Sequence, residues 1–388
     1  MKNGTNKIST DKVSKALASI EKYFVGVIPW LANMYDPNTH GFYMTVSGMK
    51  DPEMEPAIEM TAWGISLLYN YTSALDSAPQ EFHRGVIDFI CDRQDERTGL
   101  FIDKQGPTNA RETARNQSAA HRALVYLNGK KRYPHPSDKG SSDAVKAADM
   151  MPAYMESVDT YIAWLSSMDW DNKSWGAGDQ TQSSQRYIAM LPPDTGELYK
   201  SAAIEWLGAR QCENGLWSPS IDFNSASGAF KVGLVYGEWK MRLPNYDKII
   251  DSIFECYRVA KSTNPYYIRN PISVLASIAS YSPEAKEKIQ RLTVENLDVI
   301  LESFGDFLCP DGAFSAHKGS SMVSFGGVVG SHGLYEGDID ATAMMLVARR
   351  QLYEIFDMKA PLLNTDNFWD WISGKLPMPE PHIDFCNN

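Results

Sequence analysis

The feature that most restricts the fold is a joint that recurs along the chain, in which a glycine stands close to an aromatic residue between two helix-length segments. Within the segments, apolar residues lie three or four positions apart, as Val13, Leu17 and Ile20 do, which is typical of one face of an amphipathic helix. Strand patterns are weak. The joints return roughly every 50–65 residues, and helical hairpins repeated at such a period stack because one hairpin cannot bury its apolar faces alone. The pattern predicts an all-α protein.

The expected helices form six pairs. The first helix should end at Pro29, because proline interrupts a helix. Another should begin near Asp179, with Gln182 three residues on as in a capping box. The expected long helices cover residues 11–28, 56–75, 79–94, 112–128, 150–168, 179 onward, 197–211, 224 onward, 246–262, 270–281, 283–308 and 339–356.

The two ends of the chain carry near copies of one segment, EPAIEMTA at 55–62 and EGDIDATA at 336–343. If the six hairpins close into a ring, the first and last hairpins become neighbours, which would account for this likeness. We therefore expect an (α/α)6 toroid with an inner and an outer ring of helices. It should form one domain over 1–388, with a surface excursion at 129–146 and a long glycine-rich loop over the cavity mouth at 309–337. An open solenoid is the alternative.

Three of the turns resemble those of a known superfamily. The sequences are QDERTGLF at 94–101, QCENGLW at 211–217 and CPDGAF at 309–314. They resemble the Q-x-x-x-G-x-W/F repeats of terpenoid cyclases, a superfamily that includes the protein prenyltransferase β-subunits and shares the α/α toroid. The resemblance covers most of the chain and supports the same fold.

The acid segment DIDATAM at 338–344 resembles the D-x-D-D-T-A helix start of class II terpene cyclases. The resemblance places Asp340 where that family has its proton-donating aspartate, but Ala341 stands where the family has a further Asp. Prenyltransferases hold zinc with an Asp, a Cys and a His. No cysteine stands beside Asp338 and His332, so we expect no metal and no other cofactor.

Charge and composition exclude several classes of partner. The net charge of -11 and the pI near 5.2 argue against nucleic acid and anionic membranes. No run of about 18 apolar residues predicts a membrane span, and the N-terminus has no apolar signal region. The five cysteines are scattered without metal-binding or redox spacing, which favours a reduced, cytoplasmic protein.

In a toroid, the inner helices run parallel and their N-terminal ends meet at one mouth, so helix caps also line the cavity. Two helix starts each carry a pair of acids, although one acid is enough to cap a helix. Asp338 and Asp340 lie two residues apart, and Glu55 and Glu59 lie four apart, which places the glutamates on one helix face. Like charges held close raise the pKa of one group, which gives a proton donor beside a base. The candidate catalytic residues are Asp338, Asp340, Glu55, Glu59, His121, His332 and Tyr335.

The same mouth would carry polar and aromatic residues able to hold a substrate. Arginines bind carboxylate or phosphate groups, amides bind hydroxyl groups, and indole rings stack on sugar rings or carbocations. Each of these residues has an equally ordinary structural role as a cap, an ion-pair partner or a packing residue. The candidate substrate-binding residues are Trp63, Arg111, Arg115, Asn116, Trp175, Asp179, Gln182, Trp217, Asn224, Arg269, His317 and Glu336.

A cavity lined by acids, amides, arginines and indoles is more polar than a polyene would require. The sequence therefore favours a carbohydrate-active enzyme, a glycoside hydrolase or lyase, that acts on a small-molecule or oligosaccharide substrate with paired carboxylates. One alternative is a class II terpene-cyclase-like enzyme with Asp340 as the proton donor. Another is a non-catalytic toroid that binds a peptide or a partner subunit.

Overall fold

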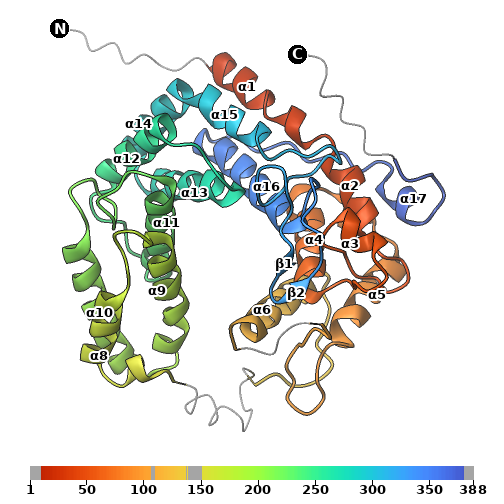
Figure 1. Ribbon diagram of the computed structural model, residues 1–388, viewed down its shortest axis with the longest axis horizontal. Coiled ribbons are helices and arrows are strands. Elements are labelled where there is room, and N and C mark those ends of the chain that lie inside the picture. Colours follow the sequence, from red (N-terminus) through yellow and green to blue (C-terminus); the bar gives the residue numbers. More distant parts are fainter. Residues whose placement is uncertain (1–9, 106–109, 137, 139–150, 380–388) are drawn as a thin grey trace. The chain divides into compact units, whose positions relative to one another are not determined.

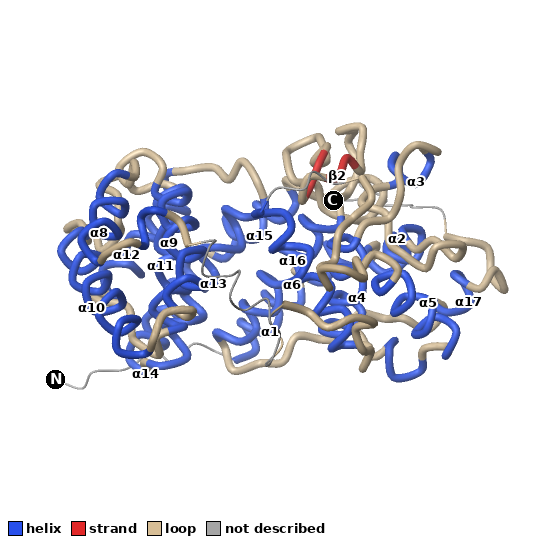
Figure 2. The backbone as a smooth tube through the Cα atoms, turned by 90° about the horizontal axis from the view of Figure 1, so that it is seen from below, coloured by secondary structure: helices blue, strands red, loops and turns tan. Residues whose placement is uncertain are grey.

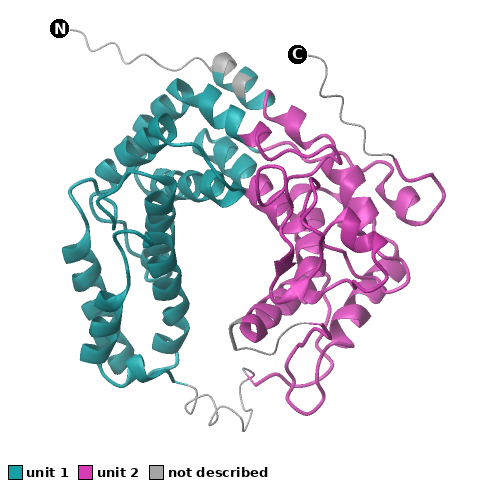
Figure 3. Ribbon diagram, viewed as in Figure 1, with its two compact units in different colours: residues 1–18, 145–303, 348–359 teal, residues 19–144, 304–347, 360–388 magenta. Residues whose placement is uncertain are grey.

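A computed structural model describes residues 10–105, 110–136, 138 and 151–379 of the chain. Regular structure in these residues is helical apart from one pair of two-residue strands (Figures 1 and 2). This confirms the all-α prediction. The chain separates into two compact units (Figure 3), which are described in turn; the prediction of a single domain stays a prediction. Unit 1 comprises residues 1–18, 145–303 and 348–359, and unit 2 comprises residues 19–144, 304–347 and 360–388.

Unit 1 is built from helical hairpins. Helix α11 packs against both α9 and α13, α8 pairs with α10, and α14 packs on α12 and α13. Buried Tyr161, Leu165, Tyr199 and Ala203 form a core between α8 and α10. The helices are α1 (Thr10–Ala18), η3 (Ala153–Met155), α8 (Val158–Ser167), α9 (Ser174–Ile188), α10 (Pro193–Arg210), α11 (Phe223–Glu238), α12 (Tyr246–Val259), α13 (Pro265–Tyr281), α14 (Pro283–Glu295) and α15 (Leu297–Gly305).

Unit 2 centres on α4, which packs against α6. Helix α5 also packs against α6. Ile58, Ala62, Phe89 and Ala120 are among the buried residues that join these three helices. The elements are η1 (Glu21–Phe24), α2 (Val27–Met34), α3 (Val46–Lys50), α4 (Ile58–Tyr71), η2 (Ala74–Ser77), α5 (Gln80–Cys91), α6 (Ala110–Tyr126), β1 (Ser324–Phe325), β2 (Val328–Val329), α16 (Ile339–Ile355, whose residues from Ala348 belong to unit 1) and α17 (Phe368–Ile372).

The recurring joint has the same backbone geometry at four places. In each, an N–H donates across the turn to a carbonyl four or five residues later, and a residue with positive φ reverses the chain, which suits glycine. His40 takes this conformation in the first turn. The bonds join Asp36 N to Gly41 O (2.9 Å), Asp95 N to Leu100 O (2.8 Å), Cys212 N to Leu216 O (2.8 Å) and Cys309 N to Ala313 O (2.8 Å).

The glutamine of the turn motif has a structural role. Gln94 Nε2 donates to the carbonyls of Gly99 and Tyr133, both at 2.8 Å. Gln211 Nε2 repeats the arrangement in the other unit, donating to Gly215 O at 2.7 Å and Pro244 O at 2.9 Å. The side chain therefore ties its own turn to a later loop, and the sequence repeat reflects a repeated tertiary bond.

Within unit 2, Met44 and Thr45, which precede the first of the two similar segments, bond to the second segment and to the loop before it. That the two segments themselves face each other stays a prediction. Ile339 N donates to Met44 O at 3.1 Å, and Thr45 Oγ1 donates to Gly330 O at 3.1 Å. Each segment also binds its own aromatic turn through an equivalent threonine. Phe42 N donates to Thr61 Oγ1 at 3.0 Å, and Phe314 N donates to Thr342 Oγ1 at 3.1 Å.

Several expected helix boundaries are wrong. Pro29 lies inside the first turn of α2, where a missing N–H costs no helical bond. The helix expected from Asp179 begins at Ser174, because this segment packs tightly on α11: a Cβ at Gly228 would lie 2.0 Å from Ser174 Oγ. The helix expected at 283–308 is two helices that meet at Asn296.

One further boundary and one loop also differ. The helix expected from 270 begins five residues earlier, where Asn264 caps Tyr267 N–H. Within the expected loop 309–337, β1 and β2 pair as a small antiparallel hairpin through Phe325 and Val328. The expected excursion at 129–146 lies partly outside the described residues.

Candidate functional site

The centre of the candidate site is an ion pair between α4 and α6. Glu59 occupies the first turn of α4 and is buried, and Arg115 reaches it from α6 with Nε 3.1 Å from Oε2 and Nη2 2.8 Å from Oε1. The β1–β2 hairpin covers the pair: the Phe325 ring lies 4.3 Å from the guanidinium carbon of Arg115. A Cβ at Gly326 would lie 2.7 Å from Glu59 Oε2, so only glycine fits this approach.

A second layer repeats the contact between the same helices. Trp63 follows Glu59 by four residues and Arg122 follows Arg115 by seven, so each pair shares one helix face. The guanidinium of Arg122 lies over the Trp63 ring, 4.3 Å from its centroid. Nε and Nη2 of Arg122 and Nε1 of Trp63 are enclosed and have no hydrogen-bond partner among the described residues. Arg122 as a whole residue is half-buried.

Asp340 is a second acid whose charge influences Arg122. It occupies the first turn of α16, at the position equivalent to Glu59, and is 2% exposed. Burial is the main influence on Arg122 and lowers its pKa, whereas the negative charges of Glu59 and Asp340 raise it. Glu59 and Asp340, from the two equivalent segments, therefore act on the same guanidinium.

Asp338 is committed to structure. It is completely buried, its Oδ1 accepts from Ala341 N–H at 2.8 Å, and its Oδ2 accepts from Ala316 N–H at 2.8 Å. The first of these bonds is an N-cap of α16. Burial raises the pKa of Asp338 to about 6, although the backbone bonds lower it.

The start of α4 is capped by a residue from elsewhere. Ala57 occupies the cap position and has no side-chain oxygen, so Asp103 Oδ1 accepts from Ile58 N–H at 2.9 Å instead. Arg93 Nε lies 3.5 Å from the same oxygen, and both side chains are almost fully buried. Burial raises the pKa of Asp103 to about 6, against the opposing effects of Ile58 N–H and Arg93.

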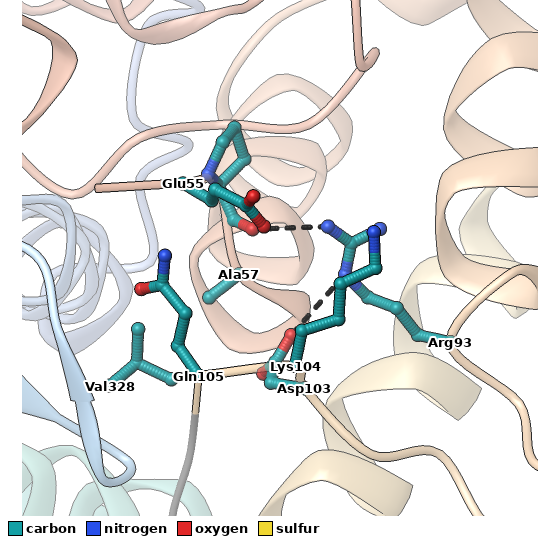
Figure 4. A pocket seen from close by; sticks show the side chains of 8 residues that line it. Glu55, Ala57, Arg93, Asp103, Lys104, Gln105 and Val328 are labelled. Atoms are coloured by element: carbon teal, nitrogen blue, oxygen red, sulfur yellow. Dashed lines mark hydrogen bonds and ion pairs between the residues drawn. The ribbon is translucent and has the colours of Figure 1, made fainter. Parts of the chain in front are cut away.

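A small pocket lies beside this cap (Figure 4). It is a shallow, partly open pocket, and the Arg93 guanidinium points in it toward Pro56 O and Asp103. These interior charges are engaged with each other and with the backbone, so the pocket offers a ligand chiefly its exposed rim, Glu55, Lys104 and Gln105. The pocket is lined by Glu55, Pro56, Ala57, Arg93, Asp103, Lys104, Gln105 and Val328.

Glu336 also serves the fold. Its carboxylate accepts from Ser47 N–H at 2.8 Å and lies within hydrogen-bonding distance of the hydroxyls of Ser321 and Ser331. Because these bonds join the 309–337 loop to α3, Glu336 holds the loop and is not presented to a substrate.

The predicted histidines and the tyrosine lie apart from the buried acids. His121 and His317 are exposed, and His332 is exposed with Nε2 2.9 Å from Asp51 Oδ2. Tyr335 is 54% exposed, and its hydroxyl donates to Leu308 O at 3.1 Å. None of these four side chains forms a hydrogen bond or ion pair with Glu59 in the described residues.

On α6, Asn116 is buried beside Arg115, and its Oδ1 has no hydrogen-bond partner among the described residues. The side chain of Arg111 lies outside the described residues.

The remaining predicted residues belong to unit 1. Trp217 is fully buried and its Nε1 donates to Leu207 O at 2.8 Å, so its placement is that of a packing residue. Asp179 forms an ion pair with Lys231 at 2.7 Å, and Gln182 is half-buried one turn further along α9.

Two aromatic contacts complete the unit 1 set. Trp175 packs at 5.5 Å from the Tyr267 ring, and Asn224 bonds Asn172 O behind it. Arg269 lies over Phe230 at 4.3 Å. These residues group on α9, α11 and α13.

The structure adds residues that sequence patterns did not select. Phe325 and Gly326 sit in a loop with many glycines, where no spacing distinguishes them. Asp103 caps a helix 45 residues away in sequence, which no local pattern reveals. Arg122 carried a usable signal, because it follows Arg115 by seven residues on one helix face.

No family model matches the chain, and no curated protein or solved structure shows significant similarity to it. Function must therefore be argued from the site. Within the described residues, no helix is long and apolar enough to cross a membrane, and no group of three or more His, Cys, Asp and Glu side chains is arranged to hold a metal ion.

Proposed function

We propose that the protein is a carbohydrate-active enzyme, a glycoside hydrolase or lyase, that works by acid/base catalysis with Glu59 and Asp340. The observation that carries the proposal is that two buried acids at equivalent helix starts, Glu59 and Asp340, both raise the pKa of Arg122, whose Nε and Nη2 have no hydrogen-bond partner in the described residues. Two carboxyl groups in different environments are the basic equipment of glycoside cleavage.

The two carboxylates have different roles in this proposal. Glu59, which accepts two bonds from Arg115, is the base. Asp340 supplies the proton to the leaving oxygen. Trp63 and Phe325 provide apolar ring faces beside the acids, against which a sugar ring can pack.

We also propose that the helical hairpins close into the (α/α)6 toroid. Support comes from the four equivalent turns and from the bonds that join Met44 to Ile339 and Thr45 to Gly330 within unit 2. Small-angle scattering from the protein in solution tests the ring: a closed toroid gives a compact profile, and an open solenoid gives a larger radius of gyration at the same mass.

A ligand screen tests the function. Thermal shifts would be measured with neutral oligosaccharides, oligouronides and prenyl diphosphates, followed by product analysis of every sugar that stabilises the protein. We expect stabilisation by at least one class of sugar, and cleavage that is lost in Asp340→Asn. A shift with prenyl diphosphate alone would overturn the proposal and favour the cyclase alternative. Binding of sugar without cleavage would leave only a binding protein.

A further inference from the structure

The β1–β2 hairpin covers the ion pair of Glu59 and Arg115 with an apolar inner face. Phe325 and Val328 are paired across the hairpin, so their side chains lie on the same face. The Phe325 ring contacts the guanidinium of Arg115, and Val328 is 4% exposed and lines the pocket in Figure 4. The next residue, Val329, lies on the opposite face and is 49% exposed. The hairpin therefore has one face on the site and the other in solvent.

The base of this hairpin is fixed to the rest of unit 2 on both sides. On one side, Met322 N–H donates to Asp338 Oδ2 at 3.4 Å. On the other side, Thr45 Oγ1 donates to Gly330 O at 3.1 Å. A Cβ at Gly330 would lie 2.8 Å from Met44 Cβ, so the base is also closely packed. Both points at which the hairpin leaves the body of the unit are therefore held in place.

Beyond the base, the hairpin is held by few contacts. Its hydrogen bonds are internal, and Gly330 N–H closes it by donating to Val323 O at 3.1 Å. In the described part of the chain, residues 323–329 form no hydrogen bond with any residue outside the hairpin. The two turn residues, Gly326 and Gly327, have φ values of 60° and 84°, as a two-residue hairpin turn requires. Side-chain packing, and not backbone hydrogen bonding, holds the tip over the ion pair.

We propose that residues 323–329 form a lid, which turns about its fixed base to uncover Glu59 and Arg115. Glu59 is 7% exposed, and the backbone of Gly326 lies so close that a Cβ there would be 2.7 Å from Oε2. A sugar cannot reach this oxygen while the hairpin is in place. Segments with little packing and no hydrogen bonds to their surroundings open locally at low cost, and such lids control access to enzyme sites. The inference rests on the proposed function, because it concerns the route of a substrate to the same site.

The Phe325 ring is the contact that favours the closed lid. It lies 4.3 Å from the guanidinium carbon of Arg115, and opening would break this contact and expose Val328 to water. Removing the ring should therefore raise the open fraction. The base should be unaffected, because its bonds to Asp338 and Thr45 do not involve the ring.

The test measures how fast Glu59 is modified by a water-soluble carbodiimide and an amine, with mass spectrometry of the digested protein. Glu336 is the matched internal reference, because it is also 7% exposed but is held by serines at the base of the hairpin. We expect Phe325→Ala to accelerate modification of Glu59 about 10-fold and to leave the rate at Glu336 unchanged, since a cation–π contact and the burial of one ring are lost.

Two control variants belong to the same hairpin. Phe325→Tyr keeps an aromatic ring over Arg115, so Glu59 should react at the wild-type rate. Val329→Ala removes an exposed side chain on the outer face and should also leave that rate unchanged. Acceleration by Val329→Ala equal to that by Phe325→Ala would overturn the role given to the ring.

Circular dichroism and the melting temperature would confirm that each variant folds. A folded Phe325→Ala protein in which Glu59 reacts no faster than in the wild type would overturn the inference. Equal acceleration at Glu59 and Glu336 would also overturn it, because the whole unit would then have loosened. If Phe325→Ala does not fold, Phe325→Leu provides the decision, since it keeps apolar volume without the aromatic face. An unchanged rate at Glu59 in that variant would overturn the lid.

A second arm separates the lid from the proposed function. The wild-type measurement would be repeated with the oligosaccharide that the ligand screen identifies, and bound sugar should slow modification of Glu59 at least about 10-fold. A sugar that binds without protecting Glu59, or failure of every sugar to bind, would overturn the proposed function, while the lid would stand on the measurements without ligand. Protection of Glu59 by sugar together with no effect of Phe325→Ala would overturn the lid alone.

Discussion

Helices α4 and α16 begin with near copies of the same segment, yet their first turns are completed differently. In α16 the cap is local, because Asp338 accepts the N–H of Ala341. In α4 the equivalent residue is Ala57, and Asp103 from a distant loop takes over. The next residue of each helix is a buried acid, Glu59 after Ile58 in α4 and Asp340 after Ile339 in α16.

The comparison separates the acids that cap the two helices from the acids that do not. A helix start needs one cap, and in both helices that need is met by an aspartate whose pKa burial raises to about 6. Glu59 and Asp340 are therefore surplus to capping in both copies. Their shared action on Arg122 is what makes them candidates for acid/base work.

The largest expected effect is on turnover. Glu59→Gln and Asp340→Asn should each lower kcat for the oligosaccharide that the ligand screen identifies by about 100- to 10,000-fold, because each removes one acid/base group. The control is Glu53→Gln, because Glu53 is exposed and lies two residues before the segment 55–62. A large loss in one variant and none in the other would show that the two equivalent positions are not a functional pair.

Stability should respond most strongly at the caps. Asp103→Ala should lower the free energy of unfolding by about 3–5 kcal/mol, because it leaves buried Arg93 without its counter-ion. Asp338→Ala should cost about 2–4 kcal/mol, because two buried N–H groups lose their acceptor. Urea denaturation measures both.

The partly exposed cap of α11 provides the reference for these losses. Asp222→Ala removes the acceptor of the Ser225 N–H and hydroxyl and should cost about 1 kcal/mol. If all three losses were equal, burial of the α4 and α16 caps would not be what makes them important.

The same two caps should give the stability a pH dependence. Their folded pKa values of about 6 exceed the ordinary value of 3.8. Between about pH 4 and pH 6, the unfolded chain has released protons that the folded chain retains, so stability falls as the pH rises through this window. Each group contributes up to about 3 kcal/mol. Asp103→Asn and Asp338→Asn should each flatten the decline, and a wild-type profile unchanged by both substitutions would contradict the assignment.

The smallest expected loss of stability should be nearly equal in the two segments. Thr61→Val and Thr342→Val keep the side-chain shape but remove the acceptor of Phe42 N–H and Phe314 N–H. Each should cost about 1–2 kcal/mol, since one buried donor is left unpaired. Melting curves of the two variants should therefore nearly coincide. A difference of several kcal/mol would break the equivalence of the two segments.

Periodic patterns in the sequence determined the helices, the repeated turns and the likeness of the two ends. These features depend on neighbours within a few residues, or on a motif that is written twice, so they can be read locally. The sequence also selected Glu59, Asp340 and Arg115, because surplus acids and same-face arginines are visible in spacing.

Only the tertiary structure showed which groups bind Asp338 and Glu336. Asp338 and Glu336 match the same acid pattern as Asp340, but backbone N–H groups and serines from other segments engage them. The start of α9 likewise depends on its packing against Gly228 rather than on the cap-like Asp179. Burial and long-range partners set the state of a polar side chain, and neither is written in the residues beside it.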